Sequence, residues 1–134
     1  MFDILDMGAS GLEVQRARMD VISENVANAG TIYNNKGENV PFRRRLARIA
    51  PGQAGDPSKP GVHVISIDED QAPFPTKYEP GNPAADKNGY IKLSNVETTV
   101  EYVNMLDASR AYEANVTMME TAKSMISSDL RLLA

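Results

Sequence analysis

The sequence has 134 residues, a formal net charge of −4 and no cysteine. This length allows one compact domain, or a smaller one that carries long helices. The mild negative charge argues against a nucleic-acid-binding protein, and the lack of cysteine excludes disulfides and cysteine metal sites. No apolar run reaches the roughly 18 residues that a membrane-spanning helix needs. The N-terminus, with Asp3 and Asp6, lacks the basic and apolar regions of a cleaved secretory signal.

The first segment, residues 1–30, is expected to form a long helix from Asp3 to Ala29. Asp3 suits the N-cap, and Gly30 stands where a left-handed residue after a helix belongs. Small and apolar residues recur at the alternating spacing of coiled-coil helices. The members of this seam are Leu5, Gly8, Leu12, Gln15, Met19, Ile22, Val26 and Ala29.

Two asparagines, Asn25 and Asn28, stand near the end of this helix. Asparagine propagates a helix poorly, because its amide competes for nearby backbone groups. The amides are expected either to tie off terminal carbonyls and bond an adjacent backbone, which is a structural role, or to serve contacts between molecules.

The middle segment, residues 31–94, holds all eight prolines and is expected to form a β-hairpin and a small β insert. Strands are predicted at residues 42–50, 62–67, 73–77 and 90–93, and the first is expected to pair with the segment that precedes the turn at Tyr33–Gly37. Turns are predicted at Tyr33–Gly37 and Asp86–Gly89, which are rich in asparagine and glycine. Without a large apolar set, these strands must be held by the helices.

Arg43, Arg44 and Arg45 concentrate positive charge at the start of the first predicted strand. One interpretation is a cationic edge that meets an acidic or polar partner. The alternative is protection of an exposed strand against wrong pairing. Nucleic acid is not expected as the partner, because no recognition motif accompanies the arginines.

Neither catalysis nor metal binding is expected. His63 is the single histidine, and its predicted strand offers no base, nucleophile or metal partner, so a structural role is favoured over a catalytic one. Asp68, Glu69 and Asp70 lack the alternating ligands and the glycine of a calcium loop, and a solvated turn is the expectation. The protein is therefore predicted to be no enzyme and to need no cofactor.

The last segment, residues 95–134, contains no glycine or proline, so a helix can run through it to roughly 55–60 Å in length. Ser94 and Glu97 have the spacing of a capping box at its start. Two apolar stripes lie side by side along this helix and together cover more than the usual arc of a surface helix. The first comprises Val96, Val100, Val103, Ala114, Met118, Met125 and Leu132, and the second comprises Ala108, Tyr112, Met119, Ile126 and Leu130.

The predicted fold is mainly α with a small β insert, in which long N- and C-terminal helices pack as a coiled coil, antiparallel or parallel. The rest of a short chain cannot cover both stripes of the C-terminal helix. Apolar surface that remains exposed on a long helix indicates assembly with other molecules.

Several motifs resemble the flagellar axial (rod and hook) protein family, and within it the proximal rod proteins of the FlgC type. Thr31-Ile32-Tyr33 stands where many axial relatives have Thr-Pro-Gly-Tyr, which fits this rod type. The resemblance covers nearly the whole chain and rests on the order of its motifs. These are Ser10-Gly11-Leu12, Arg18-Met19-Asp20-Val21-Ile22, Asn25-Val26-Ala27-Asn28, Pro41-Phe42-Arg43-Arg44-Arg45, Asp86-Lys87-Asn88-Gly89-Tyr90, Asn95-Val96 and Ala108-Ser109-Arg110-Ala111-Tyr112-Glu113-Ala114-Asn115.

The resemblance implies a structural subunit of the bacterial basal-body rod. Such subunits are exported by the flagellar type III apparatus without a cleaved signal, and they polymerise helically across the periplasm with copies of themselves and other rod proteins. The rod is a drive shaft that transmits torque and encloses the export channel. The alternative function is a soluble helical adaptor that binds a partner helix and forms no filament.

Contacts between subunits are expected at the helix seams, at the asparagine motif and at the arginine strand. The predicted interface residues are Leu5, Leu12, Met19, Ile22, Asn25, Val26, Asn28, Arg43, Arg44, Arg45, Tyr112, Met118, Met119, Met125, Ile126 and Leu130.

Overall fold

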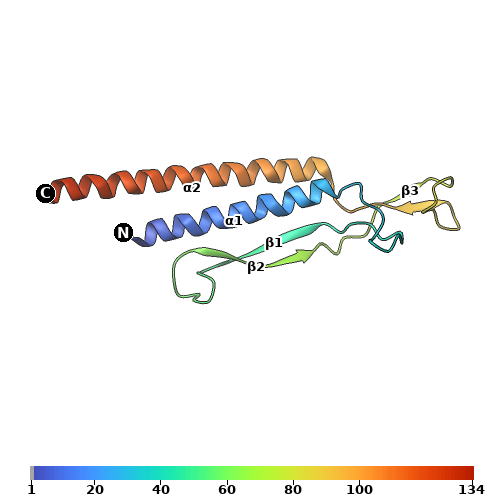
Figure 1. Cartoon of the computed structure of the whole chain (residues 1–134), viewed down its shortest axis with the longest axis horizontal. Coiled ribbons are helices and arrows are strands. Elements are labelled where there is room, and N and C mark those ends of the chain that lie inside the picture. The colour runs from blue at the N-terminus through green and yellow to red at the C-terminus, as the bar shows by residue number, and fades with distance from the viewer. Residues whose placement is uncertain (1) are drawn as a thin grey trace.

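Two long helices form an antiparallel pair along the length of the molecule (Figure 1). The computed structural model describes residues 2–134, so Met1 of the first predicted segment lies outside it. Helix α1 spans Phe2–Ala27 and helix α2 spans Thr98–Leu133. The structure thus confirms both predicted helices and selects the antiparallel arrangement. Neither helix in the described residues is both long and apolar enough to cross a membrane.

The helix ends differ from the predictions. Helix α2 begins at Thr98, after an N-cap Glu97 whose side chain makes no capping bond. The predicted capping box is wrong because the helix has its N-cap three residues later than Ser94. The Ser94 hydroxyl donates to the Phe42 carbonyl at 2.6 Å and accepts the Val96 N–H at 3.2 Å. Gly30 does not adopt a left-handed conformation. Helix α1 has already ended at Ala27, and the Asn28 amide donates to the Glu24 carbonyl at 2.9 Å.

Two small antiparallel sheets lie between the helices in the chain. Strands β1 (Arg45–Pro51) and β2 (Val62–Glu69) form one hairpin, with an irregularity in register between Arg48 and Ile49. Strands β3 (Thr76–Tyr78) and β4 (Tyr90–Lys92) form the other. The predicted pairing of the arginine strand with the preceding segment is wrong, because β1 pairs with β2. Asp68 and Glu69, predicted in a turn, belong to β2.

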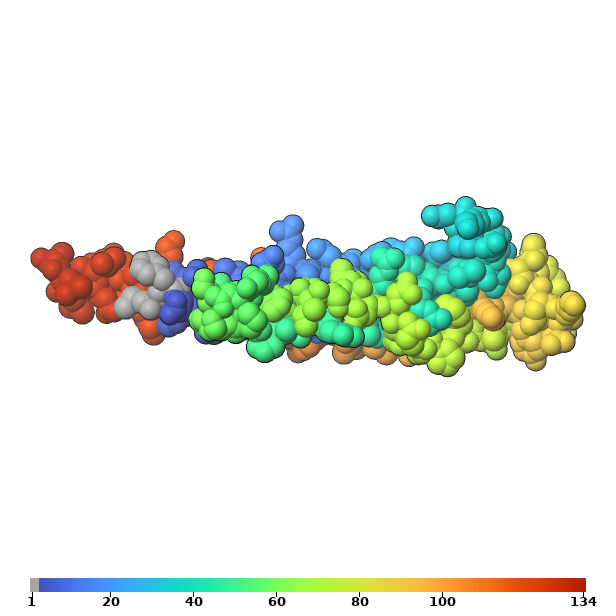
Figure 2. All heavy atoms as spheres, turned by 90° about the horizontal axis from the view of Figure 1, so that it is seen from below, coloured from blue at the N-terminus to red at the C-terminus, as the bar shows by residue number. Residues whose placement is uncertain are grey.

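Helix α1 lies between α2 and the β1–β2 hairpin (Figure 1). Its buried side chains Val14, Val21 and Ile22 form most of the small apolar core, to which α2 contributes Ala108. The β3–β4 sheet lies at the end of the molecule opposite the chain termini and buries Ile91. The molecule is therefore a narrow rod with little interior (Figure 2).

Candidate functional site

The two apolar stripes of α2 have different surroundings. The second stripe faces α1: Ala108 is fully buried, and Tyr112, Met119 and Ile126 are partly buried. The first stripe is open to solvent at Val100, Val103, Met118, Met125 and Leu132. We call these five residues the open stripe. The chain thus covers one stripe of α2 with its own α1 and leaves the other uncovered.

Small residues let the two helices approach closely near the end of the pair where the chain termini lie, which we call the open end. The opposite end of the pair is called the closed end. A Cβ atom added to Gly8 would lie 2.5 Å from Cγ of Met119, and one added to Gly11 would lie 2.8 Å from Nδ2 of Asn115. Such distances are far below van der Waals contact, so a larger residue at Gly8 would displace Met119 and one at Gly11 would displace the Asn115 amide. The glycines that weaken α1 as an isolated helix therefore serve its packing against α2.

Apolar grooves run along both sides of the helix pair. One is lined by Leu5 and Leu12 of α1 and by Val116 and Met119 of α2. The other is lined by Ile4 of α1 with Ala114, Met118 and Met125 of α2. Because consecutive helical residues point about 100° apart, Met118 and Met119 face different sides. Each groove is an apolar surface that the chain itself leaves open.

The end of α2 extends past the start of α1 (Figures 1 and 2). Helix α2 has 36 residues and α1 has 26, and about the last 10 Å of α2, two helical turns, lies beyond the start of α1. Leu130, Leu132 and Leu133 on this end are 63%, 84% and 86% exposed. We call residues 127–133 the α2 overhang. Three exposed leucines in two helical turns form an apolar surface that the chain itself does not cover.

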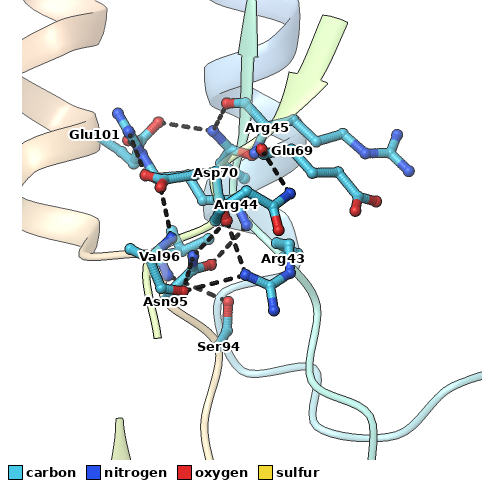
Figure 3. Close-up of polar contacts among 12 residues, drawn as sticks. Arg43, Arg44, Arg45, Glu69, Asp70, Ser94, Asn95, Val96 and Glu101 are labelled. Atoms are coloured by element: carbon cyan, nitrogen blue, oxygen red, sulfur yellow. Dashed lines mark hydrogen bonds and ion pairs between the residues drawn. The ribbon is translucent and has the colours of Figure 1, made fainter. Parts of the chain in front are cut away.

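At the other end of the helix pair, polar side chains join both helices to the β insert (Figure 3). The Glu101 carboxylate, 0% exposed, accepts hydrogen bonds from Nε of Arg44 at 2.6 Å and from Nδ2 of Asn25 at 3.0 Å. The same Asn25 amide group donates to the Arg45 carbonyl, and its oxygen accepts the Arg45 N–H. Asn25 thereby pairs with Arg45 much as a neighbouring strand would. We call Asn25, Arg44 and Glu101 the buried polar triad.

Asp70 and Asn95 extend the triad. Arg44 Nη1 lies 3.3 Å from Oδ2 of Asp70, and the backbone N–H of Arg44 donates to Asn95 Oδ1 at 2.7 Å. The Ala72 N–H bond and the Arg44 guanidinium lower the pKa of Asp70 below its ordinary value of 3.8, against a smaller opposing effect of burial. Asp70 is therefore held as a carboxylate partner for Arg44.

The flanking arginines also bond within the chain. Arg43 donates to the carbonyls of Asp70 and Ala72 and lies over the Phe74 ring, 4.2 Å from its centroid. Arg45 forms an ion pair with Glu24 at 2.6 Å. The arginine strand was expected to meet an acidic partner, and part of that partner is supplied by acids of the same chain. Contacts of these arginines with other subunits stay a prediction.

The remaining predicted interface residues divide by exposure. Ile22 and Asn25 are buried within the chain, so any contribution of theirs to a contact between subunits would be indirect. Met118, Met125 and Leu130 are exposed and free to meet a neighbour. The others are partly buried, namely Leu5, Leu12, Met19, Val26, Asn28, Tyr112, Met119 and Ile126.

The predictions missed Glu101, the most deeply buried charge of the described residues. One signal could have found it: Glu101 stands one heptad before Ala108, so it lies on the stripe that faces α1. A carboxylate on that stripe needs a buried cation or amide.

His63 contacts the Gly52 carbonyl through Nδ1 at 2.9 Å, and the described residues hold no cluster of three or more potential metal ligands.

Comparison with known proteins identifies the family. Residues 5–31 match the family model described as flagella basal body rod protein, and residues 87–132 match that of the flagellar basal body rod FlgEFG protein C-terminal region. The flagellar basal-body rod protein FlgC of Salmonella typhimurium is 40% identical, with 98% of this chain and 97% of the relative covered. The chain belongs to the FlgC family of flagellar basal-body rod proteins.

FlgC proteins of other bacteria also match this chain over nearly their whole length. The FlgC protein of Borreliella burgdorferi is 39% identical over 99% of this chain and 97% of its own length. That of Bacillus subtilis is 36% identical, with 98% of this chain and 97% of its own length covered. The resemblance inferred from motifs is thus confirmed. The FlgC family places the chain among structural rod proteins of the basal body rather than among enzymes.

Proposed function

We propose that this FlgC-family chain is a subunit of the proximal rod, which polymerises helically with copies of itself and with other rod proteins. The resulting shaft crosses the periplasm, transmits torque and encloses the export channel. The subunit reaches it through the flagellar type III export apparatus, without a cleaved signal. The observation that carries this proposal is the open stripe of α2 together with the apolar grooves on both sides of the helix pair.

Two different apolar grooves give each subunit two different surfaces on which a neighbouring subunit can pack. A contact between unlike surfaces of identical subunits is heterologous, and it generates an open helix when the rotation does not close. Coiled-coil packing of α1 and α2 with helices of neighbouring subunits would cover Met118 in one groove and Met119 in the other. In this proposal the β insert lies outside the helical tube and adds contacts there.

The β1–β2 hairpin supports a role in outer contacts. Ile49, Ile65 and Ile67 are exposed on it, although isoleucine is usually buried. The arginines at its base fix it to both helices through the Arg44–Glu101 and Arg45–Glu24 pairs. A hairpin held this firmly can carry a lateral load from one subunit to the next.

Substitutions that introduce a charge on the open stripe test the proposal. Met118→Asp and Met125→Asp alter exposed side chains, so each isolated variant should unfold within about 0.5 kcal/mol of the unsubstituted chain. Assembly should fail, because a carboxylate in an apolar helix contact loses its water. The measurements are urea denaturation of the purified chain, and swarming and rod isolation in a deletion strain carrying each variant.

Ser124→Asp, on the exposed polar face one residue before Met125, is the matched control and should support swarming. Ile22→Asp is unsuitable, since Ile22 is buried and its loss would unfold the chain itself. Normal rods with both methionine substitutions present would exclude the open stripe as a contact. A deletion strain that swims normally, with a purified chain that stays monomeric, would favour the adaptor.

A further inference from the structure

The register between the two helices follows from contacts spaced along them. Asn25 meets Glu101 at the closed end, and Arg18 lies 3.6 Å from Asp107 further along. Near the open end, Gly8 meets Met119. This register leaves the α2 overhang uncovered, with its three leucines in water.

The apolar pattern alone allows another register. Both helices repeat their apolar residues by heptads, so a slide of one heptad, about 10 Å, again places apolar residues opposite one another. Gly8 would then face Ile126 in place of Met119, and Asn25 would face Ala108 in place of Glu101. In that slid register α1 would face Leu130 and Leu133, which lie on the same side of α2 as Met119, while Leu132 on the open stripe would stay exposed. Burial of these two leucines alone therefore favours the slide.

The buried polar triad opposes the slide. Glu101 would leave Asn25 and lie beyond the end of α1, and Arg44 would lose the carboxylate that its Nε contacts at 2.6 Å. Each buried polar group that loses a partner, here the Arg44 guanidinium and the Asn25 amide, costs free energy, which opposes the slide. A single polar contact in an apolar seam is known to fix register in coiled coils.

We propose that Asn25, Arg44 and Glu101 are register-determining residues that hold α1 and α2 in the offset which keeps the overhang exposed. The chain thereby gives up burial of its own leucines and retains them as a surface for a neighbour. That consequence for assembly rests on the proposed function, whereas the choice of register is a property of the single chain.

The register can be measured as a distance between spin labels, because the chain has no cysteine of its own. Labels at Asp20→Cys and Asp129→Cys, both exposed, report the slide. Labels at Tyr102→Cys and Asp129→Cys lie on α2 alone and report that this helix stays intact. Pulsed electron resonance is recorded on full-length labelled chain diluted into unlabelled chain, with and without Asn25→Leu and Glu101→Leu.

With the triad intact, the Asp20–Asp129 label pair should give one distance. With both leucine substitutions, a second population should appear that is shorter by about 10 Å, one heptad of rise, while the α2 pair stays unchanged. Apolar residues of similar size often replace buried polar groups without loss of folding. A single unchanged distance in a folded variant would overturn the proposal.

A reciprocal variant moves the carboxylate by one heptad, through Glu101→Ala combined with Ala108→Glu. Here the shorter distance should become the major population, because the slid register restores a partner to Asn25. Absence of the shift would overturn the proposal. So would loss of helix in both variants, since the triad would then support the helix pair itself without choosing its register. Swarming assays do not enter this test, so its failure is distinct from failure of the proposed function.

Discussion

Glu101 connects helix α2 to helix α1 and to the segment before β1. Its carboxylate accepts hydrogen bonds from Asn25 in α1 and from Arg44 just before β1, which are 76 and 57 residues away from it in sequence (Figure 3). A charge with no exposure is tolerated only when it is paired and hydrogen-bonded. Sequence periodicity places Glu101 on the inner stripe, but it does not show which cation reaches it, because Arg43, Arg44 and Arg45 are equivalent as a run of letters.

Glu101→Ala should destabilise the chain by about 3 kcal/mol, because it leaves the Arg44 guanidinium and the Asn25 amide short of a buried partner. Asp68→Ala removes the exposed ion pair with Arg48 and should cost at most about 1 kcal/mol. Urea denaturation of both variants measures the difference. Equal losses would show that burial of the Glu101 pair adds nothing.

Asp70 makes the stability depend on pH in the acid range. Its pKa is lower in the folded chain than the ordinary 3.8, through the Ala72 N–H and Arg44. Its contribution is therefore complete above the unfolded pKa and disappears as the pH falls through the lowered folded value. Asp70→Asn should be less stable than the unsubstituted chain at neutral pH, and the gap should close under acid conditions. Urea midpoints across the acid range measure the gap, and a gap that stays constant contradicts this account.

Among the elements, the helix pair depends on close approach at its open end. Gly8→Leu inserts a side chain where even an added Cβ would lie only 2.5 Å from Met119 Cγ. Overpacking costs about 1–3 kcal/mol, which exceeds the roughly 1 kcal/mol that a helix gains by losing glycine.

Thermal melting of Gly8→Leu should therefore occur at a lower temperature than that of the unsubstituted chain. Ala9→Leu, at the exposed next position of the same helix, is the control and should melt within a few degrees of it. If Gly8→Leu were the more stable of the two, the close approach would have no part in the stability of the pair.

Element type was predictable, whereas element ends and partners were not. Heptad spacing identifies both helices, and the turn at Asp86–Gly89 follows from its glycine, which has a φ of 82°. The start of α2 was misplaced because Ser94 and Glu97 have the spacing of a capping box, whereas Ser94 contacts the Phe42 carbonyl and the Val96 N–H ahead of the helix. Local spacing does not show this contact with Phe42, which is distant in sequence. The pairing of β1 with β2 depends on a long loop between them, over which local pattern carries no information.

At the scale of the whole molecule, the apolar surface left exposed on α2 was predicted better than the interior, and its use as an interface stays a prediction. Two apolar stripes on one helix indicated more neighbours than one chain supplies, and the structure shows the open stripe exposed at Met118 and Met125. In the described part of the chain only a few apolar side chains are buried, among them Val14 and Ile22. A rod this thin has too little interior to be very stable alone.

The thinness of the interior has a consequence for the life of the protein. In the assembly that we propose, neighbours that bind the folded form would supply the folding free energy that the single chain lacks and would raise its apparent stability by mass action. On that proposal the polypeptide would be easy to unfold for export before incorporation and hard to extract afterwards. The durability of such a shaft would then belong to the polymer rather than to its single subunits.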